Sequence, residues 1–310
     1  MPRRTVAIFA PSPVLTVTIE ENSEGPDVHI HAGGQGVWQA RMLREFDIDV
    51  TLCAVLTGEP GTVLKHLIDD EEFTVHSFHR EGRGAAYVHD RRGGQRESIV
   101  EAEGDPLTRH DIDEIYGITL AAGLEAGTAI LSGPAGDEGL PADTYRRLAA
   151  DLRTGGCRVV VDLAGERLAA SLAGGVDVAK VSDEELLDDG RISEKETSAI
   201  LEAMRAIRTE GADTVIVTRA EEPALVLSDE GAFEVTGPQM EVVDHRGAGD
   251  SLTAGVVATL VHGGSLEDAI ITGAAAGAAN VTRHGLATSD IAAIEALKKL
   301  VRIERIGDAS

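Results

Sequence analysis

Short apolar runs rich in β-branched residues alternate along the chain with longer stretches that have helical spacing. The apolar runs are typical of buried strands and comprise Val6–Phe9, Val50–Leu56, Ala129–Leu131, Val159–Val161, Val176–Val181 and Thr214–Val217. The longer stretches have polar faces typical of helices and comprise Gln35–Phe46, Pro141–Arg153, Glu194–Arg208, Asp250–His262, Leu266–Arg283 and Ser289–Val301. This alternation predicts repeated βαβ units, and therefore a sheet covered on both sides by helices.

Two segments, Thr16–His31 and Gly84–Ile99, instead alternate polar with apolar residues and end in turn-forming residues. Each predicts a β-hairpin or an exposed strand pair. Because they lie on either side of the first βαβ unit, we expect them to meet as a small sheet that projects from the main domain. Ala224–Leu227 and Ala232–Val235 predict a further hairpin late in the chain.

Composition narrows the class of protein. The 310 residues exceed the usual size of one domain, but they fit one large α/β domain with a small insertion. Hydrophobic residues make up 43% and aromatic residues only 3%, so the core must be filled by Ala, Val, Leu and Ile. Such a core suits helices packed on a parallel sheet.

The formal net charge of -25 opposes binding to nucleic acid and to anionic membranes at long range. A site for a phosphorylated ligand would need local Lys, Arg, metal or helix N-termini to reverse that potential. Cys53 and Cys157 lie in apolar runs and are predicted to be buried, without a chemical role. The sequence has neither a membrane-spanning run nor a signal pattern, so we expect a cytoplasmic protein.

The most informative segment is Val242–Ser251, in which a strand leads into a glycine turn and a helix of small residues begins. The N–H groups at a helix start are unpaired and the helix dipole is positive there, so an anion can bind. Gly247 and Gly249 let the main chain approach such a ligand closely. Asp250 suits a base that takes a proton from a hydroxyl beside a phosphoryl group. The alternative is that Asp250 only caps the helix.

The pattern Asp244-x-x-Gly247-Ala248-Gly249-Asp250 resembles the signature of the ribokinase-like (PfkB) carbohydrate kinases. The resemblance spans nearly the whole chain and lies nearest to the branch of 1-phosphofructokinase, tagatose-6-phosphate kinase and the minor 6-phosphofructokinase. It implies a three-layer α/β/α sandwich with a small β-sheet lid. It also implies ATP-dependent phosphorylation of a sugar or sugar phosphate, with Asp250 as general base and the amides of Gly247–Asp250, including Ala248, as the anion hole.

Further landmarks of this family follow in order. Gly33–Arg41 is similar to its glycine-rich sugar-binding motif, Leu131–Gly133 to its strand-end Ser-Gly, and Lys180–Leu186 to its Lys-Pro-Asn-x-x-Glu-Leu stretch. The resemblance assigns substrate contacts to Thr16, Gly33, Gly34, Trp38, Arg83, Ser132 and Asp250. It assigns nucleotide contacts to Lys180, Ser182, Thr218, Gly247, Gly249 and Asn280, and a water-mediated contact with Mg²⁺ to Glu185.

The resemblance also implies the organisation of the chain. The main domain is expected to comprise residues 1–15, 32–82 and 100–310, and the β-lid residues 16–31 and 83–99. In the related branch the lids of two subunits often interlock, so a homodimer through the lid is expected. The expected ligand partner is a small sugar or sugar phosphate, and nucleic acid and membrane are not expected partners. No P-loop or dinucleotide-binding motif occurs in the sequence.

Arginines supply the positive charge that a phosphate site needs. Arg83 matches the family position that binds the substrate phosphate, and a planar guanidinium suits that role. The neighbouring arginines, which could instead be solvated charges on an exposed sheet edge, are Arg80, Arg91, Arg92 and Arg96. His29 and His31 lack a third ligand at metal-binding spacing, so we interpret them as polar lid residues.

Other assignments have plainer alternatives. A glycine cluster such as Gly33–Gly36 can be only a helix-entry turn, and Glu185 can be a solvent-facing helix residue. Lys180 can be a strand-end lysine that extends its amine to solvent. Each of these alternatives stays open on the sequence alone.

The sequence departs from the branch where the sugar should bind. Thr16 stands where the branch has an Asp, Trp38 replaces an Asn, Ser182 replaces the Asn of the magnesium motif, and His245 replaces a Thr. We therefore predict that phosphoryl transfer is retained while sugar recognition has changed, and that Arg246 adds positive charge beside the transferring phosphate. The alternatives are a kinase for an unphosphorylated sugar or nucleoside, and a non-catalytic sensor with a kinase fold.

Overall fold

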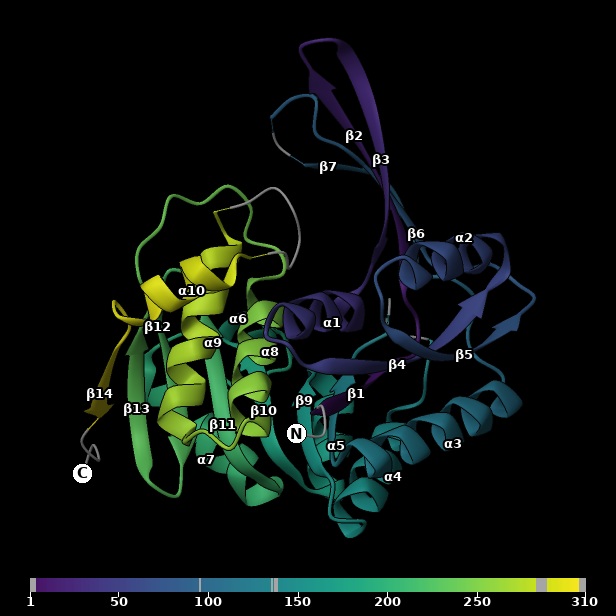
Figure 1. Ribbon diagram of the computed structural model, residues 1–310. Helices are drawn as coiled ribbons and strands as arrows, with labels where there is room; N and C mark the ends of the chain where they lie inside the picture. The colour runs from purple at the N-terminus through teal and green to yellow at the C-terminus, as the bar shows by residue number, and fades with distance from the viewer. Residues whose placement is uncertain (1–3, 95, 135, 137–138, 283–288, 307–310) are drawn as a thin grey trace.

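The computed structural model describes residues 4–306 except residues 95, 135, 137–138 and 283–288. A ten-stranded sheet runs through the molecule (Figure 1). In spatial order its strands are β14 (Arg302–Ile306), β13 (Gly231–Thr236), β12 (Glu222–Ser228), β11 (Ala212–Arg219), β10 (Val176–Ser182), β9 (Arg158–Asp162), β8 (Thr128–Ser132), β1 (Thr5–Ala10), β4 (Asp49–Thr57) and β5 (Thr74–Arg80). The strands from β11 to β5 are parallel, whereas β12, β13 and β14 pair antiparallel.

Helices cover both faces of this sheet. One face packs against α3 (Arg109–Ala126), α4 (Ala142–Thr154), α5 (Gly165–Gly174), α6 (Asp183–Asp188) and α7 (Thr197–Glu210). The other packs against α1 (Gln35–Glu45), α2 (Gly58–Asp69), α8 (Ala248–Val261), α9 (Leu266–Asn280) and α10 (Ile291–Lys298). Phe9 and Ile8, neighbours on β1, lie in opposite cores, so burial on both faces explains the continuous apolar runs. The predicted α/β/α sandwich is confirmed.

The order of the strands reverses beside β1. From β1 the chain proceeds to β4 and β5 on one side, then returns to place β8 on the other side. In an open parallel sheet, ligands bind at the carboxyl ends of the strands where the order reverses. The topology therefore places the expected site near Ser12, which follows β1, and near Ser132, which ends β8.

A second, four-stranded sheet, here called the small sheet, projects from the ten-stranded one (Figure 1). It comprises β3 (Gly25–Gly33), β2 (Val14–Asn22), β6 (Ala86–Asp90) and β7 (Glu97–Ala102). The hairpins predicted at Thr16–His31 and Gly84–Ile99 are present, and they join through the parallel pair β2 and β6. The late hairpin is formed by β12 and β13.

The two faces of the small sheet differ in polarity. Directly paired residues point to the same face, and successive residues of a strand alternate between faces. The register aligns the apolar residues Val17, Ile30, Val88 and Val100 on one face, and the polar residues Thr16, His31, Tyr87 and Glu101 on the other. The apolar face is open to solvent, since Ile30 and Val100 are 52% and 51% exposed.

Several elements escaped the sequence prediction, among them α2, α3 and β5. α2 begins with Gly58-Glu59-Pro60-Gly61, a sequence that also indicates a turn, and β5 is a half-exposed edge strand with polar side chains. α8 begins at Ala248, two residues earlier than predicted, and α9 ends at Asn280. Arg283, the predicted end of that helix, lies outside the described residues. None of the helices in the described part of the chain is long and apolar enough to cross a membrane.

Candidate active site

Polar side chains gather at the carboxyl ends of four neighbouring parallel strands. Ser132 ends β8, Asp162 ends β9, Ser182 ends β10, and Thr218 lies next to the last residue of β11. Lys180 lies two residues before the end of β10 and pairs in register with Asp162. The ladder also places Ser182 beside Thr218. These residues therefore line one edge of the sheet, where the N-terminus of α8 also lies.

Asp250 lies in the first turn of α8 and is only 8% exposed. The turn before it needs glycine at Gly247, whose φ of 77° is left-handed. At Gly249 a Cβ would lie 2.8 Å from the Nζ of Lys180, so glycine there leaves the ammonium group in place. The N–H groups of Gly249 and Asp250 have no acceptor among the described residues. An anion at this helix start would therefore meet unpaired donors and the positive end of the helix dipole.

A buried hydrogen-bond network connects Asp250 with the strand ends. The side-chain amide of Gln39, on α1, donates to Asp250 Oδ1 at 3.3 Å and to Asp162 Oδ2 at 3.4 Å. The carbonyl oxygen of the same amide accepts from Ser132 Oγ at 2.6 Å. Asp162 also accepts from Lys180 Nζ at 3.0 Å and from Thr253 Oγ1 at 2.9 Å. Because all these groups are buried and paired, the network fixes the position of the Asp250 carboxyl.

Two pKa values in this network are raised. Burial, then the nearby Asp162 carboxylate, raise the pKa of Asp250 to about 8, although Lys180 and the Gln39 hydrogen bond act in the opposite direction. Burial alone would lower the pKa of Lys180, but Asp162, Glu185 and Asp250 raise it above its ordinary value. Lys180 therefore stays an ammonium group, and Asp250 titrates close to the pH at which a general base works best.

Ser182 and Glu185 cap α6 together. Glu185 Oε2 accepts from the Ser182 N–H at 2.7 Å and from Ser182 Oγ at 2.8 Å, and the Glu185 N–H donates back to Ser182 Oγ at 3.2 Å. This capping box uses one carboxylate oxygen and leaves Oε1 for another donor. Within the described part of the chain, no three His, Cys, Asp or Glu side chains form a group that could hold a metal. Glu185 therefore fits a metal ion only if other ligands, such as phosphate oxygens and waters, complete its coordination.

Asn280 ends α9 and is buried. Its side-chain amide donates to the main-chain carbonyl of Arg246 at 2.7 Å, so it holds the loop that leads into the glycine turn. A cavity of about 370 Å³ lies beside it and is lined mainly by apolar atoms, with Met240, Ala279 and Leu297 among its walls. Thr282, Ser289 and Asp290 add polar groups.

The residues predicted to contact the sugar are only partly brought together. Thr16 is buried on β2 beside Gly33, where a Cβ would lie 2.5 Å from Thr16 Oγ1. Gly34 precedes α1 as its N-cap, and the indole N–H of Trp38 is buried without an acceptor among the described residues. Arg83 lines a small cavity together with Ser12 and Pro134. Its side chain is 86% exposed, and its Nε pairs with Asp105 at 2.7 Å.

The small sheet meets the glycine turn through a different arginine. Arg91, at the end of β6, forms an ion pair with Asp244, and its other nitrogen lies 3.8 Å from Glu20. The Asp244 carboxylate also accepts from the Arg246 N–H at 3.0 Å. The first residue of the Asp244–Asp250 motif thus links the small sheet to the loop before the anion-binding turn.

Sequence reasoning missed Asp162 and Gln39, both central to the network. Asp162 could have been predicted, because a carboxylate that directly follows the buried run Val159–Val161 lies at a strand end. Gln39 was harder to predict, because the only indication was a polar residue on the buried face of α1. Its partners lie on β8, β9 and α8, far away in sequence.

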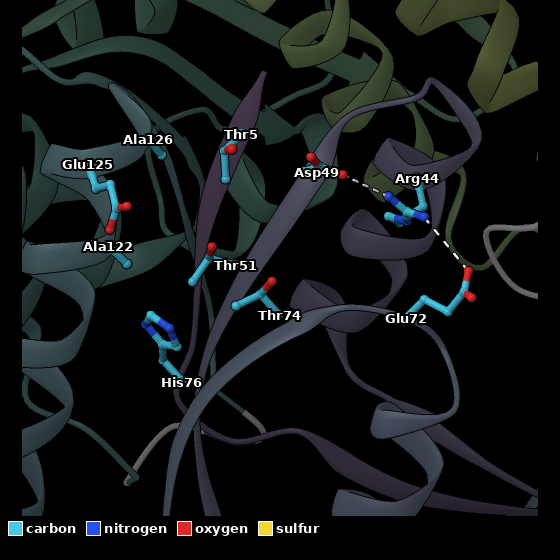
Figure 2. A pocket seen from close by; sticks show the side chains of 10 residues that line it. All are labelled: Thr5, Arg44, Asp49, Thr51, Glu72, Thr74, His76, Ala122, Glu125 and Ala126. Carbon is cyan, nitrogen blue, oxygen red and sulfur yellow. Dashed lines mark hydrogen bonds and ion pairs between the residues drawn. The ribbon is translucent and has the colours of Figure 1, made fainter. Parts of the chain in front are cut away.

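A second cavity, of about 640 Å³, lies at the opposite ends of the strands (Figure 2). Thr5, Thr51 and Thr74, from the first halves of β1, β4 and β5, line it. Arg44 lies at its rim, 3.0 Å from Asp49 and 3.9 Å from Glu72 (Figure 2). Because the predicted site residues lie at the carboxyl ends of the parallel strands, this cavity is separate from the candidate active site.

Comparisons with known proteins agree with this geometry. The chain is 24% identical over 279 residues to a 1-phosphofructokinase of Bacillus subtilis, covering 89% of each chain. It is 26% identical over 236 residues to a tagatose-6-phosphate kinase of Staphylococcus epidermidis, covering 74% of this chain and 75% of the relative. The phosphofructokinase-2 of Escherichia coli has the same fold, with a TM-score of 0.85, 22% identity and coverage of 97% and 99%. These matches confirm the predicted branch.

The family model for pfkB family carbohydrate kinases matches residues 11–293, which is most of the chain. The match includes the glycine-rich segment at the start of α1, the carboxyl ends of β8 to β11 and the first turn of α8. The protein is therefore an enzyme that transfers a phosphoryl group to a hydroxyl acceptor. The chain belongs to the pfkB family of carbohydrate kinases.

Proposed function

We propose that the protein transfers the γ-phosphoryl group of ATP to a hydroxyl of a phosphorylated sugar. One observation carries the proposal: a buried carboxyl group, Asp250, lies in the same helix turn as two N–H groups that find no acceptor within the described part of the chain. The names of the related 1-phosphofructokinase and tagatose-6-phosphate kinase support a sugar phosphate as acceptor. The cytoplasm is the expected location.

In the proposed reaction Asp250 accepts the proton of the acceptor hydroxyl while the hydroxyl oxygen attacks the γ-phosphorus. The bond from that phosphorus to the bridging oxygen breaks, and ADP leaves with the electron pair. The N–H groups of Gly249 and Asp250 would stabilise the negative charge on the transferring group, together with the start of α8. Such positioning and charge stabilisation supply most of the acceleration in phosphoryl transfer, with the base as a smaller part.

The nucleotide would lie across the ends of β10 and β11. Lys180 carries a buried positive charge beside Gly249, where a phosphate could approach it. The cavity next to Asn280 has the apolar walls that suit a purine base. Mg²⁺ would supply positive charge to the phosphates, and the free oxygen of Glu185 would bind one of its waters. Ser182 would then act through Glu185, whose carboxylate it orients.

The proposal is tested by an ADP-release screen over sugar phosphates, free sugars and nucleosides, with the Asp250→Asn enzyme as the blank. We expect ADP release with a phosphorylated sugar and no release above background for the variant. Release with only free sugars or nucleosides would show a kinase of unphosphorylated acceptors, to which the flat apolar Trp38 is suited. Ligand-induced gains in melting temperature without any ADP release would show a sensor.

We further propose that the small sheet acts as a lid and that its apolar face packs against a second copy of this chain. Val28, Ile30 and Val100 are all more than half exposed on that face. Exposed apolar surface of this kind marks interaction sites, and a homodimer places identical faces together. The polar face, which carries Tyr87 and His89, is left for the active site.

The dimer is tested by an Ile30→Asp substitution in the centre of the apolar face. We expect light scattering to report a dimer for the natural chain and a monomer for the variant. In a symmetric dimer the two introduced carboxylates would be buried in the interface without a cation to pair with. Leu300→Asp, at a residue that is also exposed but distant from the small sheet, should stay dimeric. A natural chain that is monomeric at micromolar concentration would contradict the proposal.

A further inference from the structure

Two glutamine side chains on α1 tie this helix to the end of β8. Gln35 and Gln39 are four residues apart, so they lie on the same side of the helix. The side-chain carbonyl of Gln35 accepts from the Gly133 N–H at 2.7 Å. That of Gln39 accepts from Ser132 Oγ at 2.6 Å, and the main-chain carbonyl of Ser132 accepts from the Tyr145 hydroxyl at 2.9 Å. The first turns of α1 are therefore fixed to the sheet at the strand end that faces the candidate active site.

Of these two glutamines, Gln39 also reaches the proposed base. Its amide nitrogen is shared between two carboxyl groups, at 3.3 Å from Asp250 Oδ1 and 3.4 Å from Asp162 Oδ2. Asp162 also accepts from the Lys180 ammonium group at 3.0 Å, so it is a carboxylate that can only accept hydrogen bonds. The amide must therefore present its N–H groups to Asp162 and its oxygen to Ser132. The bond from Ser132 thus fixes the orientation in which Gln39 donates to Asp250.

The two oxygens of the Asp250 carboxyl group differ in their partners. Oδ1 accepts from Gln39, whereas no donor within the described part of the chain bonds to Oδ2. Gln39 is 0% exposed, but Asp250 keeps 8% and its Oδ2 is not sealed from solvent. The protein therefore holds one oxygen and leaves the other open to a ligand. A hydroxyl that donates to Oδ2 would meet an acceptor whose direction is already fixed.

We propose that Gln39 is a positioning residue for the transfer reaction: it holds Oδ1 of Asp250 so that Oδ2 takes the proton of the acceptor hydroxyl. This inference rests on the proposed function. The O–H bond of the acceptor breaks as the O–H bond to Oδ2 forms, and the hydroxyl oxygen keeps the electron pair with which it attacks the γ-phosphorus. Gln39 is unchanged by the step. Ser132 acts through Gln39, so its hydroxyl is assigned to this network and not to the substrate contact predicted from the sequence.

The contact with Gln39 also affects the pH at which Asp250 works. Three charged groups act on this carboxyl from neighbouring elements, namely Asp162 on β9, Lys180 on β10 and Glu185 on α6. Burial, then the Asp162 charge, raise the pKa of Asp250 to about 8. Lys180 and the hydrogen bond from Gln39 act in the opposite direction, so loss of that bond should raise the pKa further. Because only the unprotonated carboxyl can take a proton, the rise of kcat/KM with pH should then occur at higher pH.

The experiment follows kcat/KM for fructose 6-phosphate and tagatose 6-phosphate at closely spaced pH values on both sides of pH 8. Gln39→Met nearly preserves the length of the side chain but removes both N–H donors. Ser132→Ala removes the bond that orients the Gln39 amide. Gln35→Met is the matched control, because Gln35 bonds to the end of β8 from the same side of α1. The melting temperature of each variant without ligand shows whether it is folded.

We expect Gln39→Met to lower kcat/KM at pH 7 by about 10- to 100-fold, because the base is both more often protonated and less well directed. The loss should be smaller above the pKa of the variant, where only the poorer direction of the base remains. Ser132→Ala should shift the pH dependence in the same direction by less, and Gln35→Met should leave its midpoint in place. A purely structural role for Gln39 would instead lower kcat/KM by the same factor at every pH.

A second measurement needs no turnover. The carboxyl carbon of Asp250 reports the pKa of this group in an NMR titration, and the signal is assigned by its absence from the spectrum of Asp250→Asn. We expect Asp250 to titrate at higher pH in Gln39→Met than in the natural chain, and at an intermediate pH in Ser132→Ala. Its titration should be unchanged in Gln35→Met.

The outcomes separate this inference from the proposed function. If the pH dependence and the titration of Asp250 in Gln39→Met coincide with those of the natural chain, the inference is overturned. If this variant does not fold, Ser132→Ala decides the same question by the same two measurements. A fully active Asp250→Asn enzyme would refute the inference together with the proposed base. Shifted titrations without turnover of any acceptor would support the contact of Gln39 with Asp250 while refuting the proposed kinase reaction.

Discussion

Replacing Asp250 with Asn is expected to lower turnover by about two to four powers of ten while nucleotide binding stays nearly unchanged. Asn cannot accept the proton of the acceptor hydroxyl, but it preserves the shape of the side chain and the N–H groups of the helix start. Steady-state ADP release measures turnover, and calorimetry with ATP measures binding. Asp229→Asn, at an exposed turn, is the matched control and should keep full activity.

The pH dependence of the free energy of unfolding of the same variant distinguishes a buried base from a helix cap. Because the pKa of Asp250 is raised to about 8 in the folded protein and lies near 3.8 when exposed, the folded state holds the proton more tightly. This contribution to stability is fully present below about pH 4, falls as the pH rises and is lost above about pH 8. Asn does not ionise, so the Asp250→Asn variant keeps this contribution to stability as the pH rises. Its free energy of unfolding should therefore exceed that of the natural chain by a few kcal/mol at pH 8 and by almost nothing at pH 4.

A capping role predicts the opposite sign. A carboxylate that caps α8 would favour the charged form, so Asn would be equal or less stable at pH 8. Urea unfolding at pH 4, 6 and 8 distinguishes the two cases. A fully active Asp250→Asn enzyme, or one that is less stable at pH 8, would contradict the role proposed for Asp250.

The fold was accessible to sequence reasoning because its signals are local. Strands buried on both faces must be continuously apolar, so runs such as Val159–Val161 identify their strands directly. The turn at Gly247 is equally local, since its left-handed backbone requires glycine. Edge elements carry no such constraint. For that reason β5, with polar side chains on a half-exposed edge, was missed.

The connections within the site were not accessible, because they depend on which distant segments meet. Gln39 gives no sign in sequence that it contacts Asp162 and Asp250, and a polar residue on a helix is ordinarily solvated. The arginines near residue 90 indicated positive charge. Only the structure shows that Arg91 pairs with Asp244, while the buried Nε of Arg96 has no acceptor among the described residues. The spacing of Ser182 and Glu185 is also that of a capping box, which the structure contains. The family resemblance had instead assigned Ser182 to the nucleotide and Glu185 to Mg²⁺.

Replacing Lys180 with Met is expected to lower the free energy of unfolding by about 3 to 5 kcal/mol. Lys180 is the buried cation of the site, and its Nζ lies 3.0 Å from Asp162, whose side chain is only 2% exposed. Met fills a similar volume but leaves Asp162 with only the neutral donors Thr253 and Gln39. An uncompensated buried charge costs far more than the packing change, and urea unfolding at pH 7 measures the difference.

Two further variants decide whether the charge is the cause. Lys180→Met combined with Asp162→Asn removes both charges, so it should recover most of the lost stability, because the cost lies in the unpaired charge rather than in the cavity. Lys65→Met breaks an exposed ion pair with Asp69 and should cost less than about 1 kcal/mol. If the double variant were no more stable than Lys180→Met, packing rather than charge would explain the loss. If both double and single variants kept full turnover, Lys180 could not be the cation that the transferring phosphate meets at Gly249.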